Sequence, residues 1–176
     1  MITIKNAVLN FPSLFTLPTI NGEKASKYST KIILDPITHK TTIKALQAEI
    51  ERLRTEGLKG IKLGADRICL RNGDDLGQEV YEGKFVLSAS TKKRPVVVQA
   101  LNGALEPLVE DDGKIYSGCI CNVNVDLWAQ DNKFGKRINC ELIAVQWKAD
   151  GEPLAGGGVS REAAVQGFDV DPDDFG

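Results

Sequence analysis

The 176-residue sequence predicts a mainly β domain with one substantial α-helix. Three observations favour this fold class. Alternating apolar and polar residues indicate several strands, most clearly over residues 116–128. One segment, residues 43–53, repeats its apolar residues at helical spacing instead. Turn signals rich in Gly, Asn, Asp and Pro separate these segments, and the length suits one domain with a proper core.

The first half of the chain contains two expected strands and the helix. Residues 2–10 predict a strand that ends before Pro12, and residues 13–26 are expected to form a loop. Residues 28–34 predict a second strand, ended by Asp35-Pro36. The helix that follows places four apolar residues on one face: Ile43, Leu46, Ile50 and Leu53. Gly57 is a natural C-cap, and Thr38 or Thr41 could cap the start.

The second half is read as strands only. Short strands are expected at residues 68–70, 84–90 and 95–100, and residues 101–113 form a long, turn-rich excursion. Residues 116–128 and 136–148 then form a long hairpin, and strands of this length are typical of a sheet that curls into a barrel. The expected fold is therefore a partly open five-stranded barrel of the oligonucleotide-binding (OB) type, with extra strands and a packed helix. A β-sandwich with one helix is the alternative.

Charge divides the chain into two parts. Residues 1–161 carry all 22 Lys and Arg and 19 of the 24 Asp and Glu, a net charge of +3. Residues 162–176 carry five acidic residues and no cation, a net charge of −5. We therefore predict a binding domain over residues 1–150 and a flexible Gly-rich tether with a disordered acidic tail over residues 151–176. A tail that only aids solubility is the alternative.

The end of this tail combines clustered carboxylates with an aromatic. Its candidate partner-binding residues are Asp169, Asp171, Asp173, Asp174 and Phe175. Such a segment cannot join a globular core, because the carboxylates repel one another and Pro172 interrupts regular structure. A mildly basic body with an acidic appendage fits a protein that binds a polyanion and carries an internal competitor for it.

Catalytic signatures are weak in this sequence. The single histidine, His39, precedes the helix, and no Gly-rich segment matches a phosphate-binding loop. The four cysteines lack metal-ligand spacing and are expected to be reduced, buried thiols in a cytoplasmic protein. We expect that the protein is not an enzyme and that it has no cofactor, bound metal or membrane association. If it is an enzyme, a metal-dependent nuclease is the alternative.

Binding residues are easier to identify, because two expected turns are cationic. Lys92, Lys93 and Arg94 join two strands, where they could contact phosphates or simply be solvated. The tip of the long hairpin adds four candidates: Lys133, Phe134, Lys136 and Arg137. Phe134 could stack on a base there or tuck under the hairpin.

Further candidates lie on strands. Trp128 is expected on the wetter face of its strand, opposite the apolar stripe, where its ring could stack. Tyr28, Lys31 and Tyr116 complete the set of nucleic-acid-binding candidates. Together these residues predict a groove that follows a single strand, of DNA or RNA alike, since stacking and phosphate contacts serve both.

The sequence resembles a family of phage and prophage single-stranded DNA-binding proteins with an OB fold. The similar stretches are Asn10–Phe15, Lys27–Leu34, Leu70–Asp74, Ile115–Cys119 and the acidic end that closes on Phe175. The resemblance implies non-sequence-specific binding and protection of single-stranded DNA during replication or recombination, in the host cytoplasm. It also implies tail contacts with replication or recombination proteins, and a homodimer. A strand-annealing mediator and a protein-interaction module without nucleic-acid binding remain the alternatives.

Overall fold

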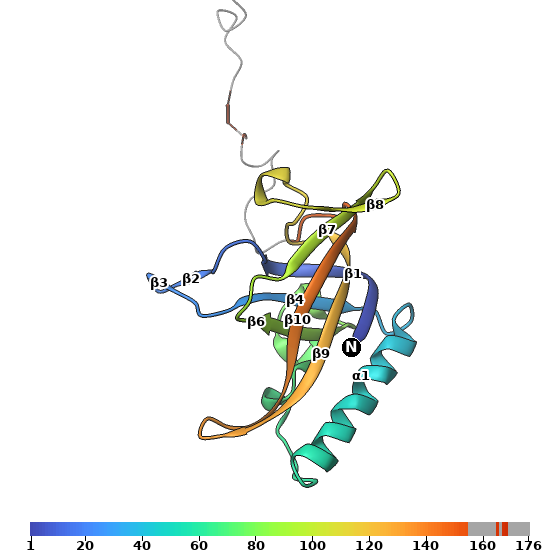
Figure 1. Cartoon of the computed structure of the whole chain (residues 1–176), viewed down its shortest axis with the longest axis vertical. Coiled ribbons are helices and arrows are strands. Elements are labelled where there is room, and N and C mark those ends of the chain that lie inside the picture. Colours follow the sequence, from blue (N-terminus) through green and yellow to red (C-terminus); the bar gives the residue numbers. More distant parts are fainter. Residues whose placement is uncertain (155–164, 166, 169–176) are drawn as a thin grey trace, which may run out of the picture.

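The computed structural model describes residues 1–154, 165, 167 and 168, and it confirms a mainly β fold with one long helix (Figure 1). The strands are β1 (Ile2–Ser13), β2 (Thr19–Ile20), β3 (Glu23–Lys24), β4 (Tyr28–Leu34), β5 (Leu70–Asn72), β6 (Phe85–Thr91), β7 (Val96–Leu101), β8 (Ala104–Pro107), β9 (Ile120–Asn132) and β10 (Gly135–Ala149). Helix α1 (Lys40–Arg52) continues into a π-helical turn, Leu53–Gly57. Short 3₁₀ helices lie at Ala65–Arg67, Gly73–Leu76, Glu79–Tyr81 and Glu110–Asp112.

Five strands close into a barrel. The sheet order is β5-β6-β4-β1-β9-β10-β7-β8, and an additional β6–β10 pairing joins the two arms of the sheet. The barrel therefore consists of β1, β4, β6, β10 and β9, with β5, β7 and β8 as extra strands. This β6–β10 contact, called the seam below, is parallel and has one paired position, Glu141 with Ser90. The fold is the OB-type barrel expected from the sequence.

The core fills the barrel because its strands alternate. On β9 the inward residues Cys121, Val123, Val125 and Leu127 are buried, whereas Trp128 on the outer face is 39% exposed. Helix α1 covers one side of the barrel (Figure 1) and buries Ile43 and Leu46. All four cysteines are buried and unpaired.

A second apolar cluster lies on the outer face of the barrel. Tyr81 packs there with Ile33 and Val86, and Leu154 packs against them. The Leu154 N–H donates to the Ser117 carbonyl (3.1 Å). Contacts of the body therefore extend to Leu154, four residues past the expected boundary at residue 150.

Several boundaries differ from the sequence expectations. Strand β1 runs through Pro12 to Ser13, with irregular pairing after Asn10 and a φ of 48° at Phe11. The expected loop at 13–26 contains the β2–β3 hairpin, and the excursion at 101–113 contains β8. Neither threonine caps the helix: His39 is the N-cap residue, without a side-chain cap bond.

Candidate nucleic-acid interface

A groove of about 510 Å³ crosses the outer surface of the barrel at the seam. Strands β4 and β6 form one wall with Lys31, Ser29, Ser88 and Ser90, and the β9–β10 hairpin forms the other. These side chains point outward because their neighbours on each strand fill the core. The groove is lined by five cationic residues: Lys27, Lys31, Arg67, Arg71 and Arg137. Two acidic residues, Asp66 and Glu141, also line it.

Two of the cationic side chains of the groove donate hydrogen bonds to neutral partners. The Lys31 ammonium donates to the Ser88 hydroxyl (2.7 Å), and the Arg137 guanidinium donates to the Asp66 backbone carbonyl (3.3 Å). Within residues 1–154, none of the five cations forms a salt bridge. Their charge is therefore available to an anion that enters the groove.

Lys31 and Arg71 act on one another. Partial burial, and then the nearby positive charge of Arg71, lower the pKa of Lys31 from its ordinary value. Two cations held close together repel each other, and an anion placed between them would relieve this repulsion.

Arg71 has a further unusual feature. Its Nε atom is buried and has no hydrogen-bond partner within the described part of the chain. A buried donor without an acceptor costs about 1–3 kcal/mol. A phosphate oxygen is an acceptor suited to a guanidinium, so a bound strand could remove this cost.

Trp128 supplies an aromatic surface at the edge of the groove. It lies on β9 opposite Asn139 on β10, and both residues line the groove. Gln130 accepts a hydrogen bond from the Asn139 amide (2.8 Å), which links the two strands beside the ring. A half-exposed indole among cations can stack on a base while its neighbours bind phosphate.

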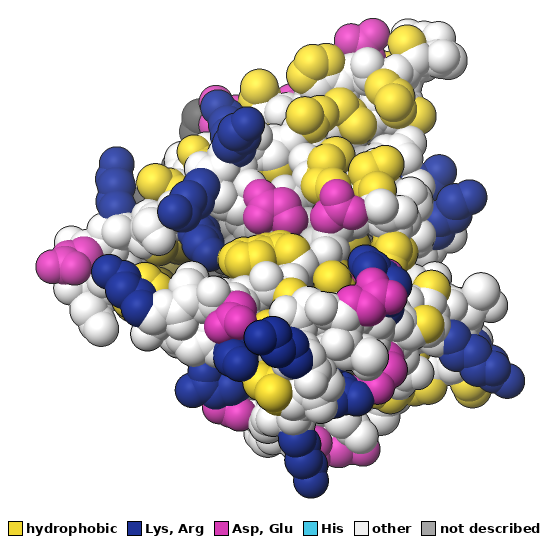
Figure 2. Space-filling view, turned by 60° about the horizontal axis from the view of Figure 1, so that its bottom comes forward, with side chains coloured by type: hydrophobic (Ala, Val, Ile, Leu, Met, Phe, Trp, Pro, Cys, Tyr) yellow, Lys and Arg dark blue, Asp and Glu magenta, His cyan; other side chains and the backbone are white. Residues whose placement is uncertain are grey.

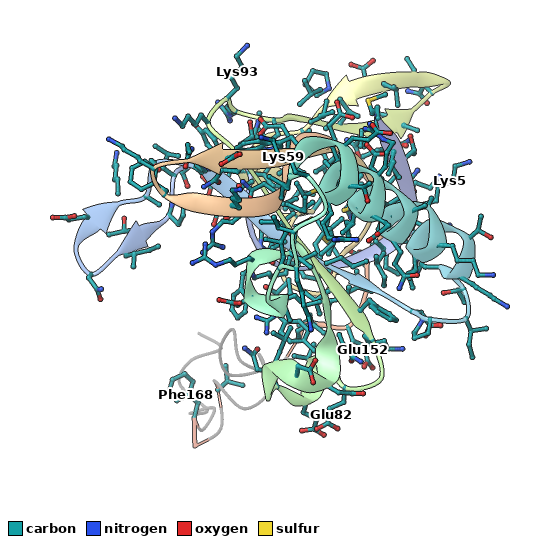
Figure 3. The ribbon with its side chains drawn as sticks, turned by 90° about the horizontal axis from the view of Figure 1, so that it is seen from below. Lys5, Lys59, Glu82, Lys93, Glu152 and Phe168 are labelled. Carbon is teal, nitrogen blue, oxygen red and sulfur yellow. The ribbon has the colours of Figure 1, made fainter. Side chains whose placement is uncertain are left out.

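The structure brings three predicted residues together in the groove: Lys31, Trp128 and Arg137. Lys92, Lys93 and Arg94 are exposed in the connector between β6 and β7, where Lys93 projects outward (Figure 3). Arg94 lies over the Phe15 ring, 5.9 Å from its centre. Tyr28 is half-buried at the start of β4, opposite Thr91.

The tip of the β9–β10 hairpin extends beyond the groove lining. Phe134 is 73% exposed there, and the Lys133 ammonium lies 5.1 Å from the centre of its ring. Lys136 is half-buried on the returning strand. The ring of Phe134 therefore does not tuck under the hairpin.

Tyr116 lies apart from the groove lining. Its hydroxyl is 3.0 Å from the Asp150 carboxylate and accepts the Gly151 N–H (3.0 Å). Burial raises the pKa of Tyr116, and its ring packs against the core. The five tail candidates, Asp169 to Phe175, lie outside the described residues.

The sequence does not indicate Lys27, Arg67 and Arg71 as site residues. Each is a single cation with no second Lys or Arg beside it in the sequence, so no local pattern indicates binding. They meet because the barrel closes at the seam, which brings residues 27–31, 66–71 and 137–141 to one surface.

Charged and hydrophobic side chains are unevenly distributed over this face of the molecule. Figure 2 shows Lys and Arg side chains over its left, lower and right parts, with Asp and Glu among them and near the centre, and hydrophobic side chains gathered at its upper end. Within the described ranges, no helix is long and apolar enough for a membrane span, and no group of three potential metal ligands occurs.

A five-stranded barrel with a cationic, aromatic-edged groove has the architecture of OB-fold proteins that bind nucleic acids. The chain belongs to the family of the single-stranded DNA-binding protein of Enterobacter phage Enc34, whose model matches residues 1–175. A protein named p50, from Acyrthosiphon pisum secondary endosymbiont phage 1, is 35% identical over 177 residues, covering 96% of this chain and 92% of the relative.

Two solved structures of the Enc34 protein are similar to this one. The single-stranded DNA-binding protein itself superposes with a TM-score of 0.75 at 28% identity, over 92% of this chain and 88% of the other. Its complex with single-stranded DNA gives a TM-score of 0.75 at 26% identity, over 87% and 88%.

Proposed function

We propose that this protein binds single-stranded DNA without sequence preference and protects it during phage DNA replication or recombination. The observation that carries the proposal is the groove at the seam, where five cations without salt-bridge partners among the described residues line one surface with Trp128 at its edge. Membership of the Enc34 family and the single-stranded DNA complex of that relative support the same ligand.

Phosphate neutralisation supplies most of the affinity. Lys27, Lys31, Arg67, Arg71 and Arg137 contact the backbone of the strand, which every sequence shares, so binding depends strongly on salt and little on sequence. Trp128 stacks on a base, and stacking is tolerant of sequence because every base has a π-face. The protein acts by binding, without a chemical step.

Basic residues beyond the groove extend this surface. Lys92, Lys93 and Arg94 lie where β6 leaves the seam, and Lys133, Phe134 and Lys136 lie on the opposite hairpin. We assign them contacts with flanking nucleotides. Tyr28 and Tyr116 remain predicted contacts, and the bonds of the Tyr116 hydroxyl to residues 150 and 151 favour a structural role for it.

The acidic C-terminal tail has a separate role from the binding domain. Residues 1–150 form the binding domain, and residues 151–176 carry the acidic end, in which Asp169, Asp171, Asp173, Asp174 and Phe175 mimic phosphates and a base. This segment competes with DNA for the body or docks replication or recombination proteins. The place of action is the host cytoplasm.

Tryptophan fluorescence tests DNA binding directly. The chain has two tryptophans, and the ring nitrogen of Trp147 is buried with Lys114 over its ring, so Trp147→Phe leaves Trp128 as the reporter. Oligo-dT should quench Trp128 at low salt, with affinity falling steeply as salt rises. Absence of binding at low salt would refute the proposal, and a parallel titration with oligo-rU compares DNA with RNA.

A further inference from the structure

The outer face of the β9–β10 hairpin places two polar side chains beside the Trp128 ring. Asn139 lies opposite Trp128 on the paired strand, and Glu141 lies two residues farther along β10. All three side chains line the groove. Opposed side chains on one face of a sheet are about 5 Å apart and diagonal ones about 7–8 Å apart. Both polar groups are therefore within reach of the edge of a base that stacks on the indole.

A relay of hydrogen bonds fixes the orientation of the Asn139 amide. The Gln130 amide nitrogen donates to the Gly135 backbone carbonyl (3.4 Å) and to Asn132 Oδ1 (3.2 Å), which also accepts the Phe134 N–H (2.9 Å). A carbonyl can only accept, so Gln130 keeps its own oxygen for Asn139, whose Nδ2 donates to it (2.8 Å). The atom of Asn139 that the relay does not use is therefore Oδ1, an acceptor.

Glu141 supplies a second acceptor, with a full negative charge. It is half-buried and forms no salt bridge within residues 1–154. Asp126, opposite it on β9, is paired with the Met1 ammonium (2.9 Å), so the charge of Asp126 is compensated and that of Glu141 is not. A carboxylate at this position repels phosphate. It is compatible with DNA binding where a hydrogen-bond donor of a base lies against it.

The two acceptors distinguish bases by the groups at their edges. Cytosine carries an amino group, which donates, where thymine and uracil carry a carbonyl oxygen, which accepts; adenine and guanine also carry amino groups. Glu and Asp side chains accept from the amino group of cytosine in protein–DNA complexes. A carbonyl oxygen placed against Glu141 or against Asn139 Oδ1 would meet another acceptor, and its lost hydration would not be replaced.

We propose that Asn139 and Glu141 accept hydrogen bonds from the base that stacks on Trp128, and so favour a base with an amino group over thymine or uracil. The inference rests on the proposed function, because it assigns a preference to one position along the bound strand. The preference is about fivefold, the worth of a hydrogen bond in a solvated groove. It is small beside the affinity for phosphates, so strands of every sequence still bind.

Oligo-dC and oligo-dU of equal length test this preference. Their bases have the same size and differ at ring position 4, where cytosine has the amino group, and in the proton on N3. Fluorescence anisotropy of labelled strands at about pH 8, where cytosine is uncharged, measures both affinities. The wild-type protein should bind oligo-dC about fivefold more tightly. Differences inherent to the two strands affect every variant alike, so the ratio of the two affinities is compared between variants.

Glu141→Gln keeps the size of the side chain and removes the charge. Both affinities should rise, and the dC-to-dU ratio should fall about threefold, because the new amide can donate to uracil. Asp66→Asn is the matched control: it removes a carboxylate that lines the same groove next to Arg137, and should raise both affinities without changing the ratio. Gln130→Ala releases the Asn139 amide to turn, so the ratio should fall about twofold.

Several results would overturn the base preference. These are equal affinities of the wild type for the two strands, an unchanged ratio in Glu141→Gln, or an equal fall in Asp66→Asn. Tighter binding of oligo-dU would show that a donor such as Arg137 contacts the base instead. An unchanged ratio in Gln130→Ala would overturn the assignment of Asn139.

The same titrations separate this inference from the proposed function. Binding that weakens steeply with salt, but with one dC-to-dU ratio in the wild type and Glu141→Gln, would refute the base preference and leave the proposed function standing. Failure of every chain to bind either strand at low salt would refute the proposed function, and the preference with it.

Discussion

At the scale of single residues, the groove depends on cations that have no carboxylate partner within residues 1–154. Arg71 illustrates this, because its buried Nε has no acceptor among the residues that the structure describes, and its positive charge repels that of Lys31. An arrangement that is unfavourable in the free protein and relieved by an anion is typical of a preorganised binding site. It contributes affinity because the ligand, and not the fold, satisfies the donors.

Removing one of these charges should weaken DNA binding measurably. Lys31→Gln and Arg71→Gln should each lower affinity for oligo-dT about tenfold, since a charge-assisted contact is worth about 1.5 kcal/mol. Each should also reduce the slope of log K against log salt by about 0.7. Fluorescence titrations at several salt concentrations measure both. Lys44→Gln, on the exposed side of α1, is the control and should change neither.

Asp35 should make stability sensitive to acid. The Lys84 ammonium (2.7 Å) and the N–H groups of Ile37 and Thr38 hold the pKa of Asp35 well below its usual range. A carboxyl with a depressed folded-state pKa contributes stability above its unfolded pKa of about 4 and loses it as pH falls further. Urea unfolding between pH 6 and 3 should show a smaller loss of stability for Asp35→Asn than for the wild type. Parallel pH curves would exclude this role.

At the scale of elements, the segment Gly151–Leu154 is joined to the body by two glycines in close contact. A Cβ on Gly118, which has a φ of +115°, would lie 2.1 Å from the Glu152 carbonyl oxygen, and one on Gly151 would lie 2.0 Å from that of Gly118. Only glycine permits this approach. The start of the C-terminal segment is therefore positioned by backbone packing.

A methyl group at this contact should be costly. Gly118→Ala should lower the free energy of unfolding by about 3 kcal/mol, because it combines backbone strain with a clash that requires movement of the chain. Gly113→Ala is the control: its φ of +66° is also strained, but nothing lies within 4 Å, so about 1 kcal/mol is expected. Urea unfolding measures both, and equal losses would show that the clash is relieved without cost.

The sequence predicts elements well where the local signal is strong. Alternation and Asp35-Pro36 define β4, and helical spacing defines α1. Strands β2 and β8 have two and four residues, too few for alternation to show, so the turn dipeptides beside them predict loops. In the site, Trp128 follows from its strand pattern. Arg67 and Arg71 do not, because their place depends on closure of the barrel rather than on their neighbours in sequence.

At the scale of the whole molecule, the acidic tail and the cationic groove belong to one chain and are expected to interact. Deleting residues 155–176 should tighten binding of oligo-dT several-fold at low salt, and the difference should vanish as salt screens the charges. A chain with Asp169, Asp171, Asp173 and Asp174 replaced by Asn is the matched control and should reproduce the effect. Unchanged affinity in both would confine the tail to docking of partner proteins.

Because the groove lies over the seam, DNA binding and the stability of the barrel should be coupled. The circumference of the barrel is completed by one paired position between β6 and β10, and the groove lies over that position. A polynucleotide that contacts Lys31 on β4 and Arg137 on β10 would link the two sides of the β6–β10 contact, which has a single paired position. Opening of the barrel would then require release of the strand, so occupancy should slow amide exchange along β6 and β10 and raise the melting temperature. The bound strand would thus stabilise the closed form of the barrel against opening between β6 and β10.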